Sequence, residues 1–362
     1  MGIFIAIFVL SFLIFFHELG HFTAARFFGV QVDVFSIGFG KKIFQKKIGK
    51  TLWALSIIPL GGYVKMKGQD DSDPTAVNYD NDSYTAKKPW QRIIILLAGP
   101  FANFFMAFLI YFGISQLSPY PSPLFNYSHY IPAKVGSFSP ISPAQKAGME
   151  INDTILSINQ TPIQYWDEIS TAIQHNKGML EIELQRNDTL ISLSLMPIRK
   201  TIKNRFGEEI ERQFIGIGPY AQGTIPPRIE FSLIEGIKFA WSETLYASTM
   251  IFKSIQKLIT GSVPANQLGG VVSIVDVTAK ASASGMVMLL LFTALISVNL
   301  GVLNLLPIPA LDGGHIMFNL YEIIRRKPPS EAVMYRLTIM GWAILLSLML
   351  LGLYNDINRL LG

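Results

Sequence analysis

The chain has 362 residues, of which 50% are hydrophobic and only 15% are charged. Its mean hydropathy is +0.37, a positive value that is unusual for a soluble protein and ordinary for a membrane protein. The net charge of +5 is too small to favour binding to nucleic acid. Because cysteine is absent, disulfides and thiolate metal sites are excluded, and any metal must be bound by His, Asp or Glu.

Four apolar segments are long enough to cross about 30 Å of hydrocarbon at about 1.5 Å per residue. We expect membrane-spanning helices at residues 1–27, 93–117, 285–306 and 337–354. A cleaved signal peptide is the alternative for the first segment. It fits poorly, because no Lys or Arg precedes the apolar run and no convincing small-x-small cleavage site follows it. The sequence therefore predicts a polytopic α-helical membrane protein with four transmembrane helices.

Lys and Arg mark the loops that face the cytoplasm. The loop 28–92 is rich in both, and the loop 307–336, which follows the third span, carries Arg325, Arg326 and Lys327. The positive-inside rule places both loops in the cytoplasm. Both termini and the long segment 118–284 then lie on the outer side, which an even number of spans allows.

The loop 28–92 contains a β-prone run at residues 52–58, which glycine-containing segments at residues 37–40 and 60–66 bracket. This pattern predicts a membrane-associated, re-entrant β-hairpin or sheet that dips toward the first span. An ordinary cytoplasmic hairpin is the alternative. The edge of such a sheet could hold an extended peptide by strand addition.

Residues 118–200 of the external segment are expected to form a compact α+β domain. Pro143–Met149 and Asp153–Asn159 are followed by a helical stretch and by two alternating runs, which predict a hairpin over Asn187-Asp188. The segment resembles the PDZ domains of bacterial envelope proteases, with their A-x-x-A-G-hydrophobic and D-x-I-x-x-hydrophobic-N motifs. Asn152 and Gln160 stand where glycine is common in that family, and Asn tolerates the left-handed conformation.

Residues 201–284 connect this domain to the third span. Between residues 229 and 261, apolar residues recur at helical spacing and are interspersed with charged ones. The pattern predicts an amphipathic helix, either at the outer membrane–water boundary or packed against the external domain.

The strongest chemical signal is His17-Glu18-Leu19-Gly20-His21, which lies inside the first span. Residues four apart share a helix face, so both imidazoles can reach one metal ion, and Glu18 is placed to polarise a metal-bound water. Ionisable groups are costly in a membrane span, which favours a functional role for this cluster.

A third metal ligand is available after the third span. Pro307 and Pro309 stop that helix, and Gly313 and Gly314 permit an irregular backbone, so that Asp312 can fold back toward the first span. His17 lies about 22 Å into its span, counted from outside at about 1.5 Å per residue, and this depth is similar to that expected for Asp312.

Together these residues resemble the site-2 protease family of intramembrane zinc metalloproteases (peptidase M50), and in particular its bacterial RseP-like branch with an external PDZ domain. The family motifs H-E-x-x-H and N-x-x-P-x-P-x-L-D-G are both complete, at residues 17–21 and 304–313, and residues 61–66 and 99–104 also match. Three features depart from the family pattern: Lys41 stands where proline is usual, residues 269–272 lack a common proline, and there is room for a single PDZ domain.

The resemblance implies that His17, His21 and Asp312 bind one Zn²⁺ per chain and that Glu18 is the catalytic base and later the proton donor. It implies a zinc-dependent endopeptidase that cleaves transmembrane segments of single-span membrane proteins, such as a pre-trimmed anti-sigma factor or remnant signal peptides. The expected location is the bacterial inner membrane, with periplasmic termini and an active site toward the cytoplasm. Expected partners are these substrates, the lipid bilayer and peptide C-termini at the PDZ domain, with no nucleic acid.

Other polar residues receive weaker predictions. Asn304 is a candidate to hydrogen-bond the substrate backbone or a tetrahedral oxyanion. Asn103 is interpreted as structural, satisfying the backbone opened by Pro100, and His315 as interfacial rather than a neighbour of the metal. His129 and His175 are expected at the surface.

Two other classes of function remain open. A metal transporter would account for two histidines and a carboxylate in a membrane but gives no reason for Glu18 or for a PDZ-like domain. A catalytically silent scaffold would account for that domain, but it gives no reason for an intact set of metal ligands.

Overall fold

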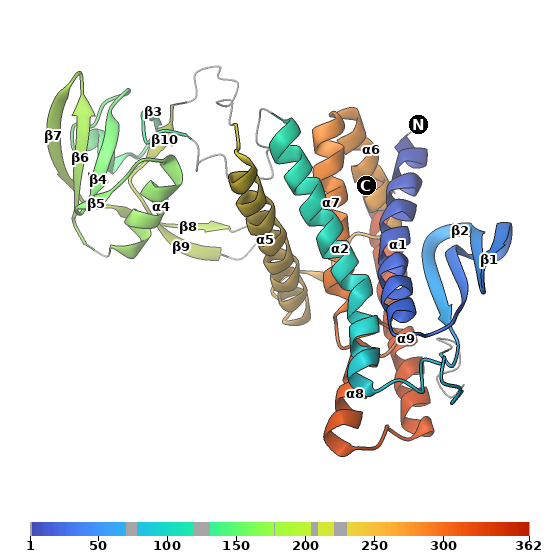
Figure 1. The fold of residues 1–362 in the computed structure, drawn as a ribbon. Helices are drawn as coiled ribbons and strands as arrows, with labels where there is room; N and C mark the ends of the chain where they lie inside the picture. Colours follow the sequence, from blue (N-terminus) through green and yellow to red (C-terminus); the bar gives the residue numbers. More distant parts are fainter. Residues whose placement is uncertain are drawn as a thin grey trace. The chain divides into compact units, whose positions relative to one another are not determined.

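The computed structural model describes residues 2–69, 78–118, 131–176, 178–203, 209–220 and 230–361. The chain divides into two compact units, one formed by residues 1–117 and 231–362 and the other by residues 118–230. The first unit is mainly helical, whereas the second is built mainly from short strands (Figure 1). His129, which is expected at the surface, lies outside the described residues.

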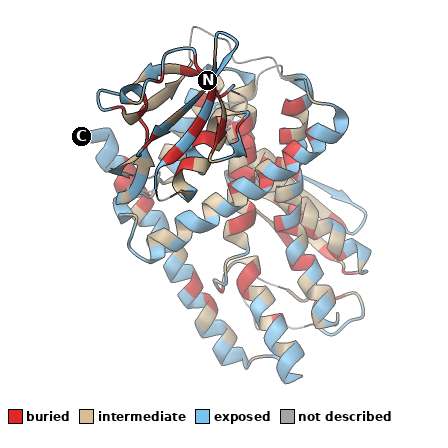
Figure 2. Ribbon diagram, turned by 90° about the vertical axis from the view of Figure 1, so that its left-hand side faces the viewer, coloured by how far each residue is buried: buried red, intermediate tan, exposed pale blue. Residues whose placement is uncertain are grey.

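Within the described part of the first unit, four helices are long and apolar enough to cross a membrane. They are α1 (Gly2–Phe27), α2 (Pro89–Leu117), α7 (Met286–Asn304) and α9 (Glu331–Leu361). Large apolar side chains such as Phe4, Phe8 and Phe101 are exposed on them, as expected for helices that face lipid. Figure 2 shows many exposed residues along the helices. The predicted number of spans is confirmed, and the protein is a polytopic membrane protein.

Helix α2 packs against both α1 and α7. The crossing with α1 is close, because a Cβ added to Gly20 would lie 2.2 Å from the carbonyl oxygen of Ala98 and 3.0 Å from the Cβ of Ala102. Small residues permit such an approach between membrane helices. On the other side, the Ser297 hydroxyl of α7 donates to the backbone oxygen of Asn103 at 2.8 Å. Helix α2 therefore fixes the position of the histidine-bearing helix relative to the third span.

We expect the substitution Gly20→Ala to destabilise the helical unit by about 1–3 kcal/mol, since the added methyl group has no space against α2. The gain in helix propensity is smaller, about 1 kcal/mol. Thermal unfolding of the zinc-free protein in detergent, followed by circular dichroism, measures the change. Gly113→Ala on α2 is the matched control, because nothing lies within 4 Å of its added Cβ. Equal unfolding temperatures for the two variants would contradict the close crossing.

The predicted sheet in the first loop is present as β1 (Val32–Ile48) and β2 (Thr51–Met66), which pair antiparallel with several register shifts. Residues 34–37 pair on one side with residues 52–55 and on the other with residues 62–65. The sheet contacts α1 through Phe35, whose ring packs edge-on against those of Phe15 and Phe22, at centroid distances of 5.7 and 5.8 Å. The loop thus folds back onto the first span, as its sequence predicts.

Four further helices are described in the first unit: α5 (Leu233–Ile259), the 3₁₀ helix η2 (Ala265–Gln267), α6 (Val271–Ala283) and α8 (Asp312–Arg325). Helix α5 is the predicted amphipathic helix, and it packs against α2 and α7. Its buried residues include Gly236, Ala240 and Ala247, while Ile234 and Trp241 are exposed.

The C-terminal end of α9 is attached to the start of α6. The Asp356 carboxylate accepts hydrogen bonds from the backbone N–H groups of Gly270 and Ser273, both at 3.0 Å. The Asn355 side chain donates to the carbonyl oxygens of Ala265 and Leu268. These contacts cap α6 and explain why α9 runs to Leu361, beyond the predicted span 337–354.

The second unit is an α+β domain with a four-stranded antiparallel sheet in the order β5-β4-β6-β7. Its elements are β3 (Val135–Phe138), α3 (Pro143–Lys146), β4 (Thr154–Ile158), β5 (Thr161–Pro162), α4 (Trp166–His175), β6 (Leu180–Arg186), β7 (Thr189–Leu195), β8 (Ile198–Lys203), β9 (Glu209–Phe214) and β10 (Ile217–Pro219). Alternate residues of β6, Leu180, Ile182 and Leu184, are fully buried in its core, together with Ile169 and Ile173 of α4. Strand β3 pairs with β10, and β8 pairs with β9.

Turns in this domain follow the sequence closely. The predicted hairpin over Asn187-Asp188 is confirmed, with φ values of 44° and 65° that suit a two-residue turn. Asn152 and Gln160 also have positive φ, at 77° and 63°, so both adopt the conformation that glycine favours. The compact unit extends to Glu230, beyond the predicted domain end at residue 200.

Candidate metal centre

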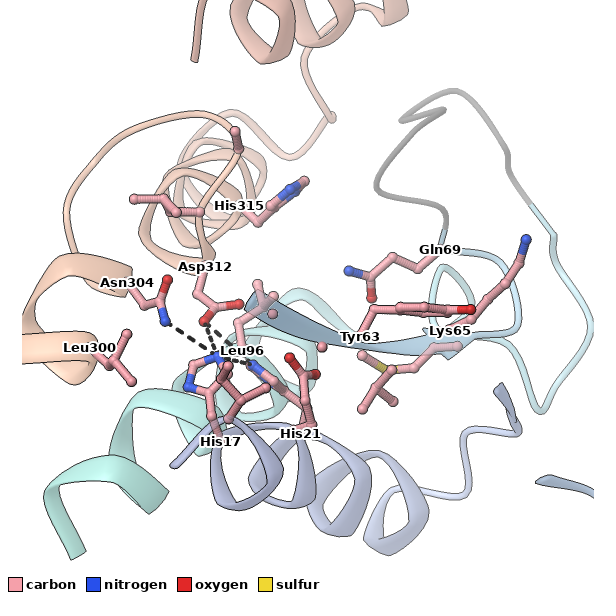
Figure 3. A pocket seen from close by; sticks show the side chains of 18 of the residues that line it. His17, His21, Tyr63, Lys65, Gln69, Leu96, Leu300, Asn304, Asp312 and His315 are labelled. Carbon is pink, nitrogen blue, oxygen red and sulfur yellow. Dashed lines mark hydrogen bonds and ion pairs between the residues drawn. The ribbon is translucent and has the colours of Figure 1, made fainter. Parts of the chain in front are cut away.

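The structure brings His17, His21 and Asp312 together, from helices that are far apart in the sequence. The Asp312 Oδ2 atom lies 3.4 Å from Nε2 of His17 and 3.4 Å from Nε2 of His21. The two Nε2 atoms are 3.2 Å apart. Figure 3 shows the three side chains pointing toward one another, with the two histidines on α1 and Asp312 at the start of α8. Among the described residues, this is the one group of three or more His, Asp or Glu side chains with metal-binding spacing.

This triangle fits a zinc ion. Zinc binds histidine nitrogen at about 2.0–2.1 Å in tetrahedral geometry, which separates neighbouring ligand atoms by about 3.3 Å. The three measured separations, 3.2, 3.4 and 3.4 Å, agree with that value. Two imidazoles and one carboxylate also form a typical donor set for catalytic zinc, which keeps its fourth position for water or substrate.

The local backbone explains how Asp312 reaches the histidines. After α7 ends at Asn304, the chain turns tightly, with hydrogen bonds from the N–H groups of Ala310 and Leu311 to the carbonyl of Ile308. A Cβ added to Gly313 would lie 2.2 Å from the carbonyl oxygen of Leu306, and one added to Gly314 would lie 2.3 Å from that of Ile308. Only glycine fits at these two positions, so the L-D-G-G segment is required to fold the turn and start α8 at Asp312.

Helix α2 holds the other side of the site. His21 Nδ1 donates to the backbone oxygen of Ile95 at 2.9 Å, which leaves Nε2 with its lone pair free for a metal. Gly99 makes room for the same ring, because an added Cβ would lie 2.1 Å from His21 Nε2. The side chain of His21 is thus positioned by a helix that contributes no ligand to the triangle.

The two imidazoles also act on the ionisation of Asp312. Burial by itself raises the pKa of the Asp312 carboxyl, but the neighbouring imidazoles of His21 and His17 outweigh it and hold that pKa well below its usual range. Asp312 therefore presents an anionic oxygen. Glu18, which is 8% exposed, is next to His17 in the sequence and brings a second carboxylate to the same cavity.

The centre lies in a cavity of about 950 Å³. Residues 61–66 of β2 line one wall, and residues 310–312 line another. Figure 3 shows Tyr63 and Lys65 of the first wall across from Asp312. A Cβ on Gly62 would lie 2.9 Å from Cγ of Glu18, so the sheet approaches this carboxylate closely. The arrangement can hold a metal ion, a carboxylate that accepts protons and an extended chain side by side.

The structure also places three other residues that the sequence analysis singled out. Asn304 lines the cavity, and its Nδ2 lies 3.4 Å from His17 Nε2, so it is near the centre as expected. His175 is exposed, as predicted. His315, which is interpreted as interfacial, lines the cavity three residues beyond Asp312. One helical turn separates the two residues, and this spacing places both on the same face of α8.

The interpretation that the Asn103 side chain hydrogen-bonds the backbone opened by Pro100 is wrong. Its side-chain Nδ2 lies 3.1 Å from Nδ1 of His17, and the residue is fully buried. The signal in the sequence is an amide in the middle of an uncharged span, which does not reveal its partner.

Comparison with known proteins agrees with this geometry. The chain matches the family model "Peptidase family M50" over residues 5–348. It is 46% identical to the "Putative zinc metalloprotease Cj1068" of Campylobacter jejuni, over 98% of this chain and 92% of the relative. It is 40% identical to the "Putative zinc metalloprotease" of Helicobacter pylori strain J99, over 99% of both chains. A relative from Clostridium acetobutylicum, "Putative zinc metalloprotease CA_C1796", is 34% identical over 98% of this chain and 97% of its own.

Four spanning helices and a two-histidine, one-aspartate centre define a membrane-embedded metalloprotease with zinc as its cofactor. The chain belongs to peptidase family M50, the site-2 proteases, whose general activity is intramembrane proteolysis.

Proposed function

We propose that this protein is a zinc-dependent intramembrane endopeptidase that cleaves the transmembrane segments of single-span membrane proteins. The observation that carries the proposal is the juxtaposition of His17, His21 and Asp312 with Glu18 in one cavity of a unit that contains four spanning helices. A pre-trimmed anti-sigma factor and remnant signal peptides are the proposed substrate classes, by analogy with the family.

In this proposal His17, His21 and Asp312 hold the zinc ion, which supplies a Lewis acid for the scissile carbonyl and for water. Glu18 accepts a proton from the attacking water and returns it to the leaving amine. Asn304, which lines the cavity near His17, donates a hydrogen bond to the substrate backbone or to the developing oxyanion.

The wall formed by residues 61–66 is the proposed docking edge for the substrate. A peptide bond within a helix is shielded by its own hydrogen bonds, so the substrate must be locally extended before it reaches Glu18. Residues 62–66 pair with β1, and no other described strand pairs with them, which leaves an edge for strand addition. Gly61 and Gly62 line the cavity without side chains, so a peptide backbone can approach closely.

We propose that the α+β domain is a PDZ domain outside the membrane, which filters substrates by size or binds newly formed C-termini. The left-handed Asn152 and Gln160 support this assignment, because glycine is common at these positions in such domains. Arg26 in the last turn of α1 and Arg325 in the last turn of α8 support a cytoplasmic position for the lower ends of these helices in Figure 1. The proposed location is the inner membrane, with periplasmic termini and the active site toward the cytoplasm.

Metal removal tests the proposal. The purified protein in detergent should cleave a single-span model substrate, lose that activity when a chelator removes zinc, and regain it when about one equivalent of zinc per chain is returned. Cleavage products are measured by electrophoresis and mass spectrometry, and bound metal by elemental analysis. Zinc flux into sealed vesicles without cleavage of full-length or externally trimmed substrates would favour a transporter instead.

A further inference from the structure

The ring of His17 has a second nitrogen, and the polar group that faces it is the side chain of Asn103. The Asn103 Nδ2 atom lies 3.1 Å from His17 Nδ1. Asn103 is 0% exposed, and its backbone oxygen accepts the hydrogen bond from Ser297, so its main chain is held between α2 and α7. Its Oδ1 atom is buried and has no hydrogen-bond partner among the described residues. A buried amide with an unsatisfied oxygen next to a metal-binding ring calls for an explanation.

The position of the proton on the His17 ring provides this explanation. A neutral imidazole carries a single N–H, so a histidine that binds zinc through Nε2 must carry its proton on Nδ1 and donate it. His21 meets this requirement, because its Nδ1 donates to the carbonyl of Ile95. At His17, an amide N–H directed at Nδ1 suits only the other tautomer, in which Nε2 is protonated and cannot bind metal.

Rotation of the Asn103 amide resolves the conflict. The oxygen and nitrogen of an amide have nearly the same size, so a half-turn about the Cβ–Cγ bond exchanges them without disturbing the surrounding atoms. Oδ1 then faces His17 Nδ1 and accepts a hydrogen bond from its N–H group. The side chain of Asn103 can therefore stabilise either tautomer of His17, according to which end of the amide faces the ring.

We infer that Asn103 is a positioning residue of the zinc centre, whose Oδ1 accepts the Nδ1–H of His17 and thereby fixes His17 as an Nε2 ligand. The inference rests on the zinc site of the proposed function. A hydrogen-bond acceptor behind a metal-binding histidine orients the ring and raises its basicity, and loss of such a partner typically costs 10–100-fold in metal affinity. The backbone of Gly99 also approaches His17, so the contribution of Asn103 must be measured directly.

Zinc affinity is the decisive measurement, because it does not depend on a substrate. The full-length protein in detergent is titrated with zinc in competition with a fluorescent chelator. We expect Asn103→Leu, which has a similar shape and no acceptor, to bind zinc about 10–100-fold more weakly than wild type. Asn103→Asp, whose carboxylate only accepts hydrogen bonds, should bind zinc at least as tightly as wild type. A purely structural role would not produce this opposite order.

Asn319→Leu is the control. Asn319 is another buried amide whose Oδ1 has no hydrogen-bond partner within the described part of the chain, and its Nδ2 donates to the carbonyl of His315. Its zinc affinity should remain that of wild type. Wild-type zinc affinity in a folded Asn103→Leu variant would overturn the inference. The backbone of Gly99 would then be the partner that orients the His17 ring. If Asn103→Leu does not fold, weaker zinc binding by Asn103→Asp overturns it equally. Tight, Asn103-dependent zinc binding without peptide cleavage would instead contradict the proposed function alone.

Discussion

Replacing Glu18 with Gln is expected to abolish cleavage while leaving zinc in place. Gln has the shape of Glu but cannot accept a proton from the attacking water, and general-base catalysis typically contributes about 10²–10⁴-fold to the rate. Glu18 is not part of the triangle formed by the three candidate ligand atoms, so metal binding should survive the substitution. Cleavage of a single-span substrate and bound zinc are measured on the same purified sample.

Glu243→Gln provides a matched control for this variant. Glu243 lies on α5, does not line the cavity, and burial raises its pKa to about 7, so that neutral Gln resembles its protonated form. Its cleavage rate should be close to that of wild type. Substantial cleavage by Glu18→Gln would show that another group accepts the proton, whereas loss of zinc from it would indicate that Glu18 also helps to hold the metal.

A second large effect, on zinc affinity, is expected at Gly99, which is not one of the three candidate ligands. In Gly99→Ala the new methyl carbon would lie 2.1 Å from Nε2, 2.5 Å from Cε1 and 2.7 Å from Cδ2 of His21. The ring cannot easily move away, because its Nδ1 is hydrogen-bonded to the carbonyl of Ile95 on the same helix. We therefore expect zinc affinity to fall by at least about 100-fold, even though all three candidate ligands remain.

Elemental analysis and chelator competition measure this loss, and thermal unfolding without zinc shows whether the protein still folds. Gly113→Ala, on the same helix but with open space around the added Cβ, should bind zinc as wild type does. A Gly99→Ala variant that binds zinc as tightly as wild type would mean that α2 shifts away from α1 at little cost, contrary to the close crossing at Gly20.

The features that the sequence could predict are those with a short-range signal. The spacing of His17 and His21 follows from one helix, and the turn at Asn187-Asp188 follows from residues that accept positive φ. Asp312 could be placed near the histidines because prolines and glycines define where α7 must stop. Each of these depends on a few consecutive residues and on rules that hold in any fold.

What could not be predicted depends on contacts between distant segments. The predicted fourth span ends at residue 354, where polar residues begin, but in the structure Asn355 and Asp356 bind the backbone at residues 265–273 and the helix continues. A hydropathy pattern cannot distinguish a polar residue that ends a helix from one that makes a buried contact. The partnership of Asn103 with His17 was missed for the same reason, because it joins two helices 86 residues apart.

The glycine-lined wall beside Glu18 has a consequence for substrate selection. Gly61 and Gly62 offer main-chain atoms and no side chains, so a peptide held there, as we propose, is recognised through features that all peptides share. Amino-acid identity then contributes little to selection. If a substrate is held in this way, what would separate it from other membrane proteins is how easily its helix opens at the depth of the metal. A glycine, proline or asparagine at that level should then matter more than any consensus sequence around the cleaved bond.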